Sequence, residues 1–171
     1  MNLSPHFTLE ELDGLGAPEA IIRNLRETAQ RMEEFRAIVG APFHVTSGYR
    51  SQQHNVAVGG SKTSDHPNGL AVDGTFSGLT MFEVWRRLFA SGVDLPPFDQ
   101  IIFYPFTSGH IHFGFGPRMR RQVLVKLNET DYAPISQELV GLFPGRTITI
   151  GAGALVAVIV AITVLVRKGK R

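Results

Sequence analysis

Apolar residues recur at helical spacing in two long stretches of the chain. Residues 17–39 carry apolar side chains three or four positions apart with charged residues between them, which predicts an amphipathic helix lying on a core. Residues 79–91 repeat this pattern and contain Trp85, which we interpret as a core residue rather than a substrate platform. Residues 8–12 begin with a capping-box pattern and predict a short helix that ends near Gly14.

Shorter stretches have the composition of β-strands, and turn residues separate them. Residues 43–46 predict a strand that enters a glycine turn. Residues 98–103 and 110–115 predict two neighbouring antiparallel strands, joined by a turn at residues 105–109. Residues 118–127 mix basic and apolar side chains, so they predict a final helix or strand packed on the sheet.

The C-terminal part of the chain has a different pattern. Residues 148–166 contain no charged side chain, and as a helix they would span about 28 Å at ~1.5 Å per residue, close to the ~30 Å hydrocarbon core of a bilayer. They predict a transmembrane helix; the alternative is a buried core helix, although such helices seldom run so far without a polar face. Residues 128–147 contain scattered proline and glycine and predict a linker, in which residues 135–142 can form a short helix; residues 167–171 are a basic tail.

Composition narrows the class of protein. A length of 171 residues allows one domain with a sizeable core and an appendage. The formal net charge is only +2 and four of the 17 basic residues lie in the last five positions, so the composition gives no reason to expect nucleic-acid binding. The chain has no cysteine, which excludes disulfides and thiolate metal sites. Residues 1–15 lack the basic start and apolar run of a signal peptide.

Residues 47–73 combine polar side chains with glycine turns, a pattern typical of a site rather than a core. His66 and Asp73 lie seven positions apart, but Pro67 and Gly69 between them make a continuous helix improbable, so we expect a loop that runs into a strand. Imidazole and carboxylate are both good zinc ligands, and a catalytic zinc typically takes three protein ligands and keeps one position open for water. A third donor is therefore required.

The third donor is expected in the strand at residues 110–115. Strand alternation places His110 and His112 on one face, so one histidine can bind metal while the other faces substrate. The remaining histidines, His6, His44 and His54, have no partner at a ligand spacing. We interpret them as surface or hydrogen-bonded residues.

Several motifs together resemble those of the zinc D-alanyl-D-alanine carboxypeptidase family, which also includes phage peptidoglycan endopeptidases. The likeness covers about residues 3–124 and is specific as a joint pattern, although each short piece alone is weak. Its parts are SGYRS at 47–51, Asn55, VGG at 58–60, SxHxxGxAxD at 64–73 and the late His112.

The resemblance implies a set of functional residues. The implied zinc ligands are His66, Asp73 and His112. Zinc held there would polarise a peptide carbonyl and make hydroxide available near neutral pH. The resemblance also implies that Arg50 pairs with a substrate carboxylate. Two serines, Ser47 and Ser64, can donate a hydrogen bond to the substrate or orient a ligand, and Asp99 is either an acceptor for a ligand histidine or a solvent-facing strand residue.

The general acid/base is the point where the chain departs from the family. Many relatives carry an acid three residues before the last zinc histidine, where this chain has Gly109, and some carry a glutamate where this chain has Tyr104. We expect His110 to substitute, since imidazole can exchange protons near neutral pH. The alternatives are an acid from elsewhere, or a site that binds zinc and turns over poorly.

The sequence thus predicts an α+β domain over residues 1–127, in which helices cover a small antiparallel sheet, as in the hedgehog/DD-peptidase fold that the resemblance implies. We expect a membrane-anchored zinc peptidase that cuts peptidoglycan stem peptides, as a carboxypeptidase or a cross-link endopeptidase. The alternative is a non-catalytic peptidoglycan-binding or structural virion protein with the same fold.

The basic tail favours a cytoplasmic C-terminus and a domain that faces the cell wall. Without a signal peptide, the tail itself would have to direct that translocation. A phage origin is a hypothesis that eases this conflict, because lytic enzymes often lack export signals and some virions contain membranes.

Overall fold

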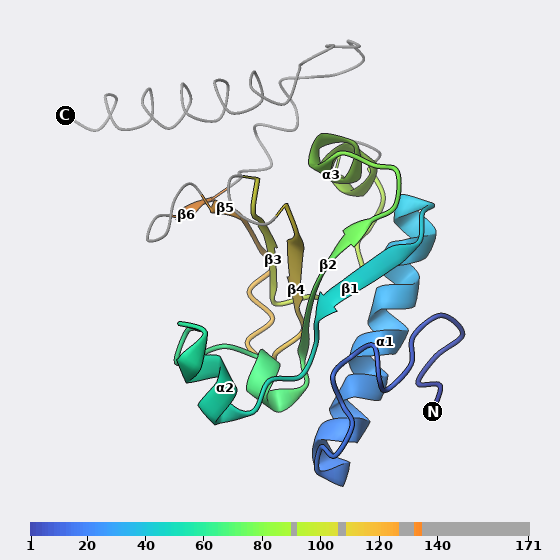
Figure 1. The fold of residues 1–171 in the computed structure, drawn as a ribbon. Coiled ribbons are helices and arrows are strands. Elements are labelled where there is room, and N and C mark those ends of the chain that lie inside the picture. Colours follow the sequence, from blue (N-terminus) through green and yellow to red (C-terminus); the bar gives the residue numbers. More distant parts are fainter. Residues whose placement is uncertain (90–91, 106–108, 127–131, 135–171) are drawn as a thin grey trace, which may run out of the picture. The chain divides into compact units, whose positions relative to one another are not determined.

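The computed structural model describes residues 1–89, 92–105, 109–126 and 132–134. Their elements, in chain order, are α1 (Glu19–Val39), β1 (Phe43–Ser47), α2 (Gln52–Ala57), the 3-10 helix η1 (His66–Asn68), β2 (Ala71–Phe76), α3 (Met81–Phe89), β3 (Gln100–Phe103), β4 (Ile111–Gly114), β5 (Gln122–Lys126) and β6 (Tyr132–Pro134) (Figure 1). This mixture of helices with one small sheet agrees with the predicted α+β class.

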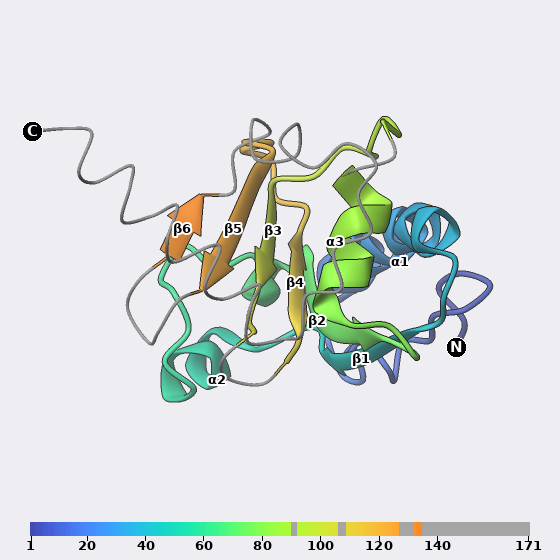
Figure 2. The ribbon, with the colours of Figure 1, turned by 90° about the horizontal axis from the view of Figure 1, so that it is seen from above.

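The six strands form one sheet in the order β1-β2-β4-β3-β5-β6 (Figure 2). All neighbouring strands are antiparallel except β3 and β5, which are parallel, so the sheet is mixed and the prediction of an antiparallel sheet is wrong at this pair. The reason is the chain path. After β4 the chain crosses to the far side of β3, and because β5 runs opposite to β4, it must run parallel to β3.

The core lies between α1 and one face of the sheet. The ring of Phe35, from the buried side of α1, lies 5.0 Å from that of Phe113 and 6.1 Å from that of Phe115, measured between centroids. Ile111 and Phe113 are both buried and share one face of β4. Because successive side chains of a strand point to opposite faces, His112 lies on the face away from α1.

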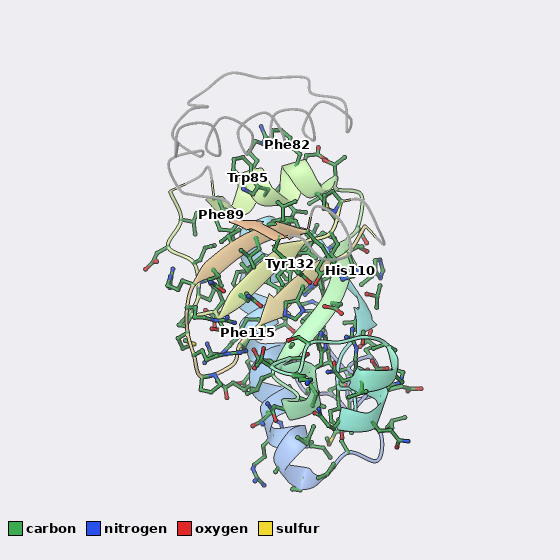
Figure 3. The ribbon with its side chains drawn as sticks, turned by 90° about the vertical axis from the view of Figure 1, so that its left-hand side faces the viewer. Phe82, Trp85, Phe89, His110, Phe115 and Tyr132 are labelled. Carbon is green, nitrogen blue, oxygen red and sulfur yellow. The ribbon has the colours of Figure 1, made fainter. Side chains whose placement is uncertain are left out.

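The aromatic side chains of α3 form a row on its less buried side (Figure 3). The rings of Phe82 and Trp85 stack at 5.9 Å with an interplanar angle of 19°, and Phe89 follows at 6.4 Å from Trp85. The buried residues of α3 are Val84 and Leu88, one helical turn apart. The core side of this helix is thus aliphatic, and Trp85 is only partly buried, so the interpretation of Trp85 as a core residue is right only in part.

The predicted helix at residues 8–12 is wrong, although its capping bonds form. Glu11 Oε2 accepts hydrogen bonds from the backbone N–H and the hydroxyl of Thr8, at 2.9 and 2.8 Å, and the Glu11 N–H donates to Thr8 Oγ1 at 3.2 Å. The segment forms turns instead. Asp13 has a φ of 55°, in the left-handed region, so the chain leaves the helical path after one turn.

The strand β6 lies within residues 128–147, which the sequence predicts as a linker; a three-residue strand gives too short a pattern to be recognised. The predicted short helix at 135–142, the transmembrane helix at 148–166 and the basic tail at 167–171 lie outside the described residues. Among the helices that the structure describes, none is long and apolar enough to cross a bilayer.

Candidate metal centre

Three donor residues from separate segments meet on the face of the sheet away from α1. Asp73 on β2 and His112 on β4 are directly paired across the two strands, and His66 reaches them from η1. Each offers one ligand atom, and these atoms lie within 4.8 Å of one another. His66 and Asp73 are buried, and the side chain of His112 is 12% exposed. The structure thus brings together the three residues that the resemblance implies as zinc ligands.

The spacing of these atoms is suitable for a metal ion. His66 Nε2 lies 3.3 Å from both Asp73 Oδ1 and His112 Nδ1, and the last two atoms lie 2.8 Å apart. Ligand atoms about 2.0–2.1 Å from a tetrahedral zinc lie roughly 3.3 Å from one another. Two of the three separations match this value and the third is shorter. Two imidazole nitrogens and one carboxylate oxygen are also a donor set that zinc prefers, so these residues fit the ion.

A backbone carbonyl orients His66. Its Nδ1 lies 2.6 Å from the Gly48 oxygen, and because a carbonyl can only accept, Nδ1 carries the proton. The lone pair of Nε2 is then directed at Asp73 and His112. Metal-binding histidines in proteins are commonly fixed in this way by a hydrogen bond to the other ring nitrogen.

Asp73 is held in its charged form. Burial would raise the pKa of its carboxyl, but the hydrogen bond from His112 and the close approach of the His66 ring outweigh burial and hold the pKa well below its usual range. Asp73 is therefore a carboxylate at neutral pH, which is the form that binds a metal ion.

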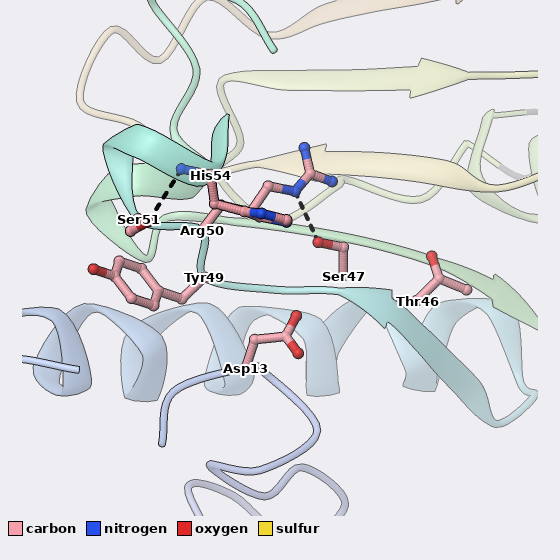
Figure 4. Close-up of a pocket in the computed structure, with 7 residues that line it drawn as sticks. All are labelled: Asp13, Thr46, Ser47, Tyr49, Arg50, Ser51 and His54. Atoms are coloured by element: carbon pink, nitrogen blue, oxygen red, sulfur yellow. Dashed lines mark hydrogen bonds between the residues drawn. The ribbon is translucent and has the colours of Figure 1, made fainter. Parts of the chain in front are cut away.

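Arg50 contacts the donor cluster through Asp73. Its bond to Ser47 is shown in Figure 4. Its Nη2 pairs with the second carboxylate oxygen of Asp73, and its Nε donates to Ser47 Oγ at 2.8 Å. Ser47 thus orients the arginine. Ser64 Oγ lies 3.4 Å from the His66 N–H, a distance at which a hydrogen bond is weak.

A hollow of about 420 Å³ opens beside Arg50 (Figure 4). Its lining residues are Asp13, Thr46, Ser47, Tyr49, Arg50, Ser51 and His54. His54, which the sequence gives no ligand partner, therefore borders this hollow. His6 instead pairs with Glu33 at 2.8 Å, away from it.

His110 lies within electrostatic range of Asp73 and His112, but just outside the strand, because β4 begins at Ile111. Its ring stacks on that of Tyr104, with centroids 4.3 Å apart and an interplanar angle of 25°. The Gly109 N–H donates to the Tyr104 carbonyl at 3.2 Å, and the Tyr104 N–H donates to the His110 carbonyl at 3.1 Å. Gly109 has a φ of 69°, so this turn uses a conformation that side chains disfavour.

The surroundings shift both stacked rings toward their neutral forms. Burial lowers the pKa of His110, and this effect outweighs the attraction of the Asp73 carboxylate. Burial and the neighbouring Tyr132 raise the pKa of Tyr104. At neutral pH the imidazole can therefore accept a proton, while the phenol remains a hydrogen-bond donor.

Neither prediction for Asp99 is right. Its side chain is fully buried, and its carboxylate accepts hydrogen bonds from the Arg120 guanidinium at 2.9 and 2.6 Å. Arg118 lies 3.4 Å from Asp99 and 2.7 Å from Asp65, the residue before His66. This network ties the loop that carries His66 to the segment between β4 and β5. The sequence signal for this network is the pair Arg118 and Arg120, two positions apart in a segment that mixes basic and apolar residues.

A family model described as Peptidase M15 matches residues 5–113 of the chain. The matched range contains all three donors, and it confirms the family resemblance seen in the motifs. No curated protein matches the chain.

Proposed function

Because the chain belongs to the peptidase M15 family, we propose that it is a membrane-anchored zinc metallopeptidase that hydrolyses peptide bonds in bacterial peptidoglycan. The observation that carries this proposal is the convergence of His66 Nε2, Asp73 Oδ1 and His112 Nδ1, with the first oriented by a backbone carbonyl. Zinc held by His66, Asp73 and His112 would polarise a peptide carbonyl and make hydroxide available near neutral pH.

Arg50 supplies the means of recognising a stem peptide. Its guanidinium has five donors, of which two are used by Asp73 and Ser47, so its planar fork can also bind a substrate carboxylate. A peptide that ends in a free carboxylate, such as the D-Ala-D-Ala end of a stem peptide, is the substrate class that this arrangement favours. The same chemistry also permits a cross-link endopeptidase. Ser47 and Ser64 are the side chains proposed to hydrogen-bond to the substrate.

Proton transfer is assigned to His110. Hydrolysis needs a group that takes the proton of the attacking water and returns it to the leaving amine. His110 is close enough to Asp73 and His112 for their charges to affect its pKa, and its ring stacks on that of Tyr104. This placement supports the proposal that His110 takes the role of the acid that relatives carry at the position of Gly109 or Tyr104.

The membrane anchor in this proposal is residues 148–166, and the basic tail that follows favours a domain facing the cell wall or the outside of a virion membrane. The partners are peptidoglycan stem peptides and a lipid bilayer, with no nucleic acid, as expected of a phage or bacterial lytic enzyme. Protease treatment of intact cells tests the orientation: a domain that stays protected inside the cells contradicts it.

A second function is supported by one observation, the Gly109 and Tyr104 pair. Gly109 has no side chain, and the Tyr104 phenol cannot carry a proton as a carboxylate does. A protein that keeps the zinc ligands and has lost proton transfer would bind peptidoglycan, or serve as a structural virion membrane protein, without cutting it.

The deciding experiment is mass spectrometry of peptidoglycan fragments after incubation with the zinc-loaded full-length protein, beside its His66→Ala variant. New peptides that the variant does not release establish a peptidase, and their masses identify the bond. Zinc-loaded, folded protein that releases none supports the binding function.

A further inference from the structure

The carbonyl that orients His66 belongs to Gly48, and the N-terminal turn binds the peptide groups on both sides of this residue. The Gly48 oxygen accepts a hydrogen bond from His66 Nδ1 at 2.6 Å. The N–H of the same peptide group, which belongs to Tyr49, donates to the Leu12 oxygen at 2.8 Å. The Gly48 N–H donates to Asp13 Oδ2, also at 2.8 Å. Both supports come from adjacent residues, 12 and 13, so one turn fixes the acceptor of His66.

The turn approaches Gly48 so closely that no other residue fits there. A Cβ atom at this position would lie 2.3 Å from the Leu12 oxygen and 2.5 Å from its carbonyl carbon, which are backbone atoms that cannot rotate away. Leu12 itself is fully buried. The close packing of this turn against the backbone therefore requires a glycine at position 48.

Asp13 adopts a conformation that its residue type disfavours. Its φ of 55° lies in the left-handed region, where glycine is accommodated without steric penalty and asparagine or aspartate at a moderate one. Backbone conformation alone would favour glycine at position 13. The carboxylate has a separate role, which is the bond to the Gly48 N–H.

We propose that Asp13 is a positioning residue for the metal centre: through Gly48 it fixes the His66 ring so that Nε2 faces Asp73 and His112. The inference rests on the proposed zinc site. It assigns to the N-terminal turn a role in metal affinity, in addition to its packing on the core. Because Asp13 also lines the hollow beside Arg50 (Figure 4), loss of turnover alone does not test it, and the readout must be metal binding.

The experiment compares Asp13→Gly and Asp13→Asn in the full-length protein. Zinc affinity is measured by competition with a chromophoric chelator, and the thermal midpoint is measured without metal. Asp13→Gly removes the bond to Gly48 and relieves the left-handed residue, so we expect zinc affinity to fall about tenfold while the metal-free midpoint stays equal or rises. Asp13→Asn keeps an acceptor and tolerates this φ, so its affinity should stay within about twofold of wild type.

Glu10→Gln is the matched control, since Glu10 lies in the same turn with an exposed side chain. An Asp13→Gly protein that binds zinc as tightly as wild type overturns the inference, as does an affinity loss that only follows a fall in the metal-free midpoint. Wild-type protein that binds zinc but releases no peptides contradicts the proposed activity and leaves this inference standing. Wild-type protein that binds no zinc contradicts both.

Discussion

Asp73 and His112 are directly paired across β2 and β4, with His112 Nδ1 2.8 Å from Asp73 Oδ1. Two of the three metal donors are therefore fixed by the backbone ladder of a sheet, which cannot shift without breaking hydrogen bonds. The third donor, His66, comes from a short 3-10 helix and depends on the Gly48 carbonyl for its orientation. The centre joins a rigid pair to a donor that other parts of the chain must hold.

The charge of Asp73 is expected to dominate metal affinity. Asp73→Asn keeps the shape of the side chain but offers a neutral amide, a poor zinc ligand, and leaves Arg50 without its carboxylate partner. We expect zinc affinity to fall by about a hundredfold or more. This loss is larger than the one that usually follows mutation of a residue that only hydrogen-bonds to a metal ligand. Chelator competition measures it, with Asp94→Asn as the control on a fully exposed aspartate. Unchanged affinity in Asp73→Asn would place the metal elsewhere.

Asp99 is expected to make the domain acid-sensitive. Burial would raise the pKa of its carboxyl, but hydrogen bonds from Arg120 outweigh burial and hold the pKa below its ordinary 3.8. A group with a depressed folded pKa stabilises the fold above its unfolded pKa, and this stability is lost as pH falls through the folded value. The loss should therefore begin below about pH 4.

Asp99→Asn should lower the free energy of unfolding by about 2 kcal/mol at pH 7, because Arg120 is partly exposed and water replaces part of the lost interaction. Below pH 4 the difference from wild type should shrink. Chemical denaturation at a series of pH values measures both effects. A difference that stays constant down to pH 2 would show that the Asp99 charge is not the cause.

The sequence predicted the parts of this centre that depend on local pattern. Alternation along residues 110–115 placed His112 opposite the apolar residues of β4, and Pro67 with Gly69 indicated the loop that carries His66. Contacts between distant segments gave no such signal. The bond from Gly48 to Asp13 joins residues 35 positions apart, and the Asp99–Arg120 pair joins residues 21 apart, so no local periodicity records either.

The parallel pairing of β3 with β5 was missed for a related reason. Residues 118–127 show which side chains are apolar, but not on which side of β3 the chain passes after β4. The neighbour of a strand is set by the whole sheet, whereas the pattern within the strand shows only its two faces.

Loss of the His110 side chain is expected to lower kcat rather than to weaken substrate binding. His110→Ala removes the proposed proton carrier and leaves Arg50 and the three donors in place, so kcat should fall by about a hundredfold or more, with KM nearly unchanged. Steady-state kinetics on a stem-peptide substrate measures both constants. Partial rescue of kcat by added imidazole would identify proton transfer as the lost step. Wild-type kcat in His110→Ala would assign the acid/base to another group.

Position 104 is where a carboxylate should restore or increase proton transfer. Burial and the Asp73 carboxylate raise the pKa of Tyr104, and both would move the pKa of a glutamate there toward neutrality. A general acid/base works best with a pKa near the operating pH, so Tyr104→Glu should raise kcat at least about tenfold, also in a His110→Ala background.

Gly109→Glu should not raise kcat, although the family resemblance implies an acid at this position in many relatives. Gly109 has a φ of 69°, so a glutamate would adopt a left-handed conformation at a cost of about 1–2 kcal/mol and distort the turn that holds His110. Steady-state kinetics on Tyr104→Glu and Gly109→Glu measures kcat for each variant. Thermal midpoints verify that both proteins are folded. A folded Tyr104→Glu protein no faster than wild type would mean that Tyr104 does not face the reacting bond, and the proton would then have to pass through His110 alone.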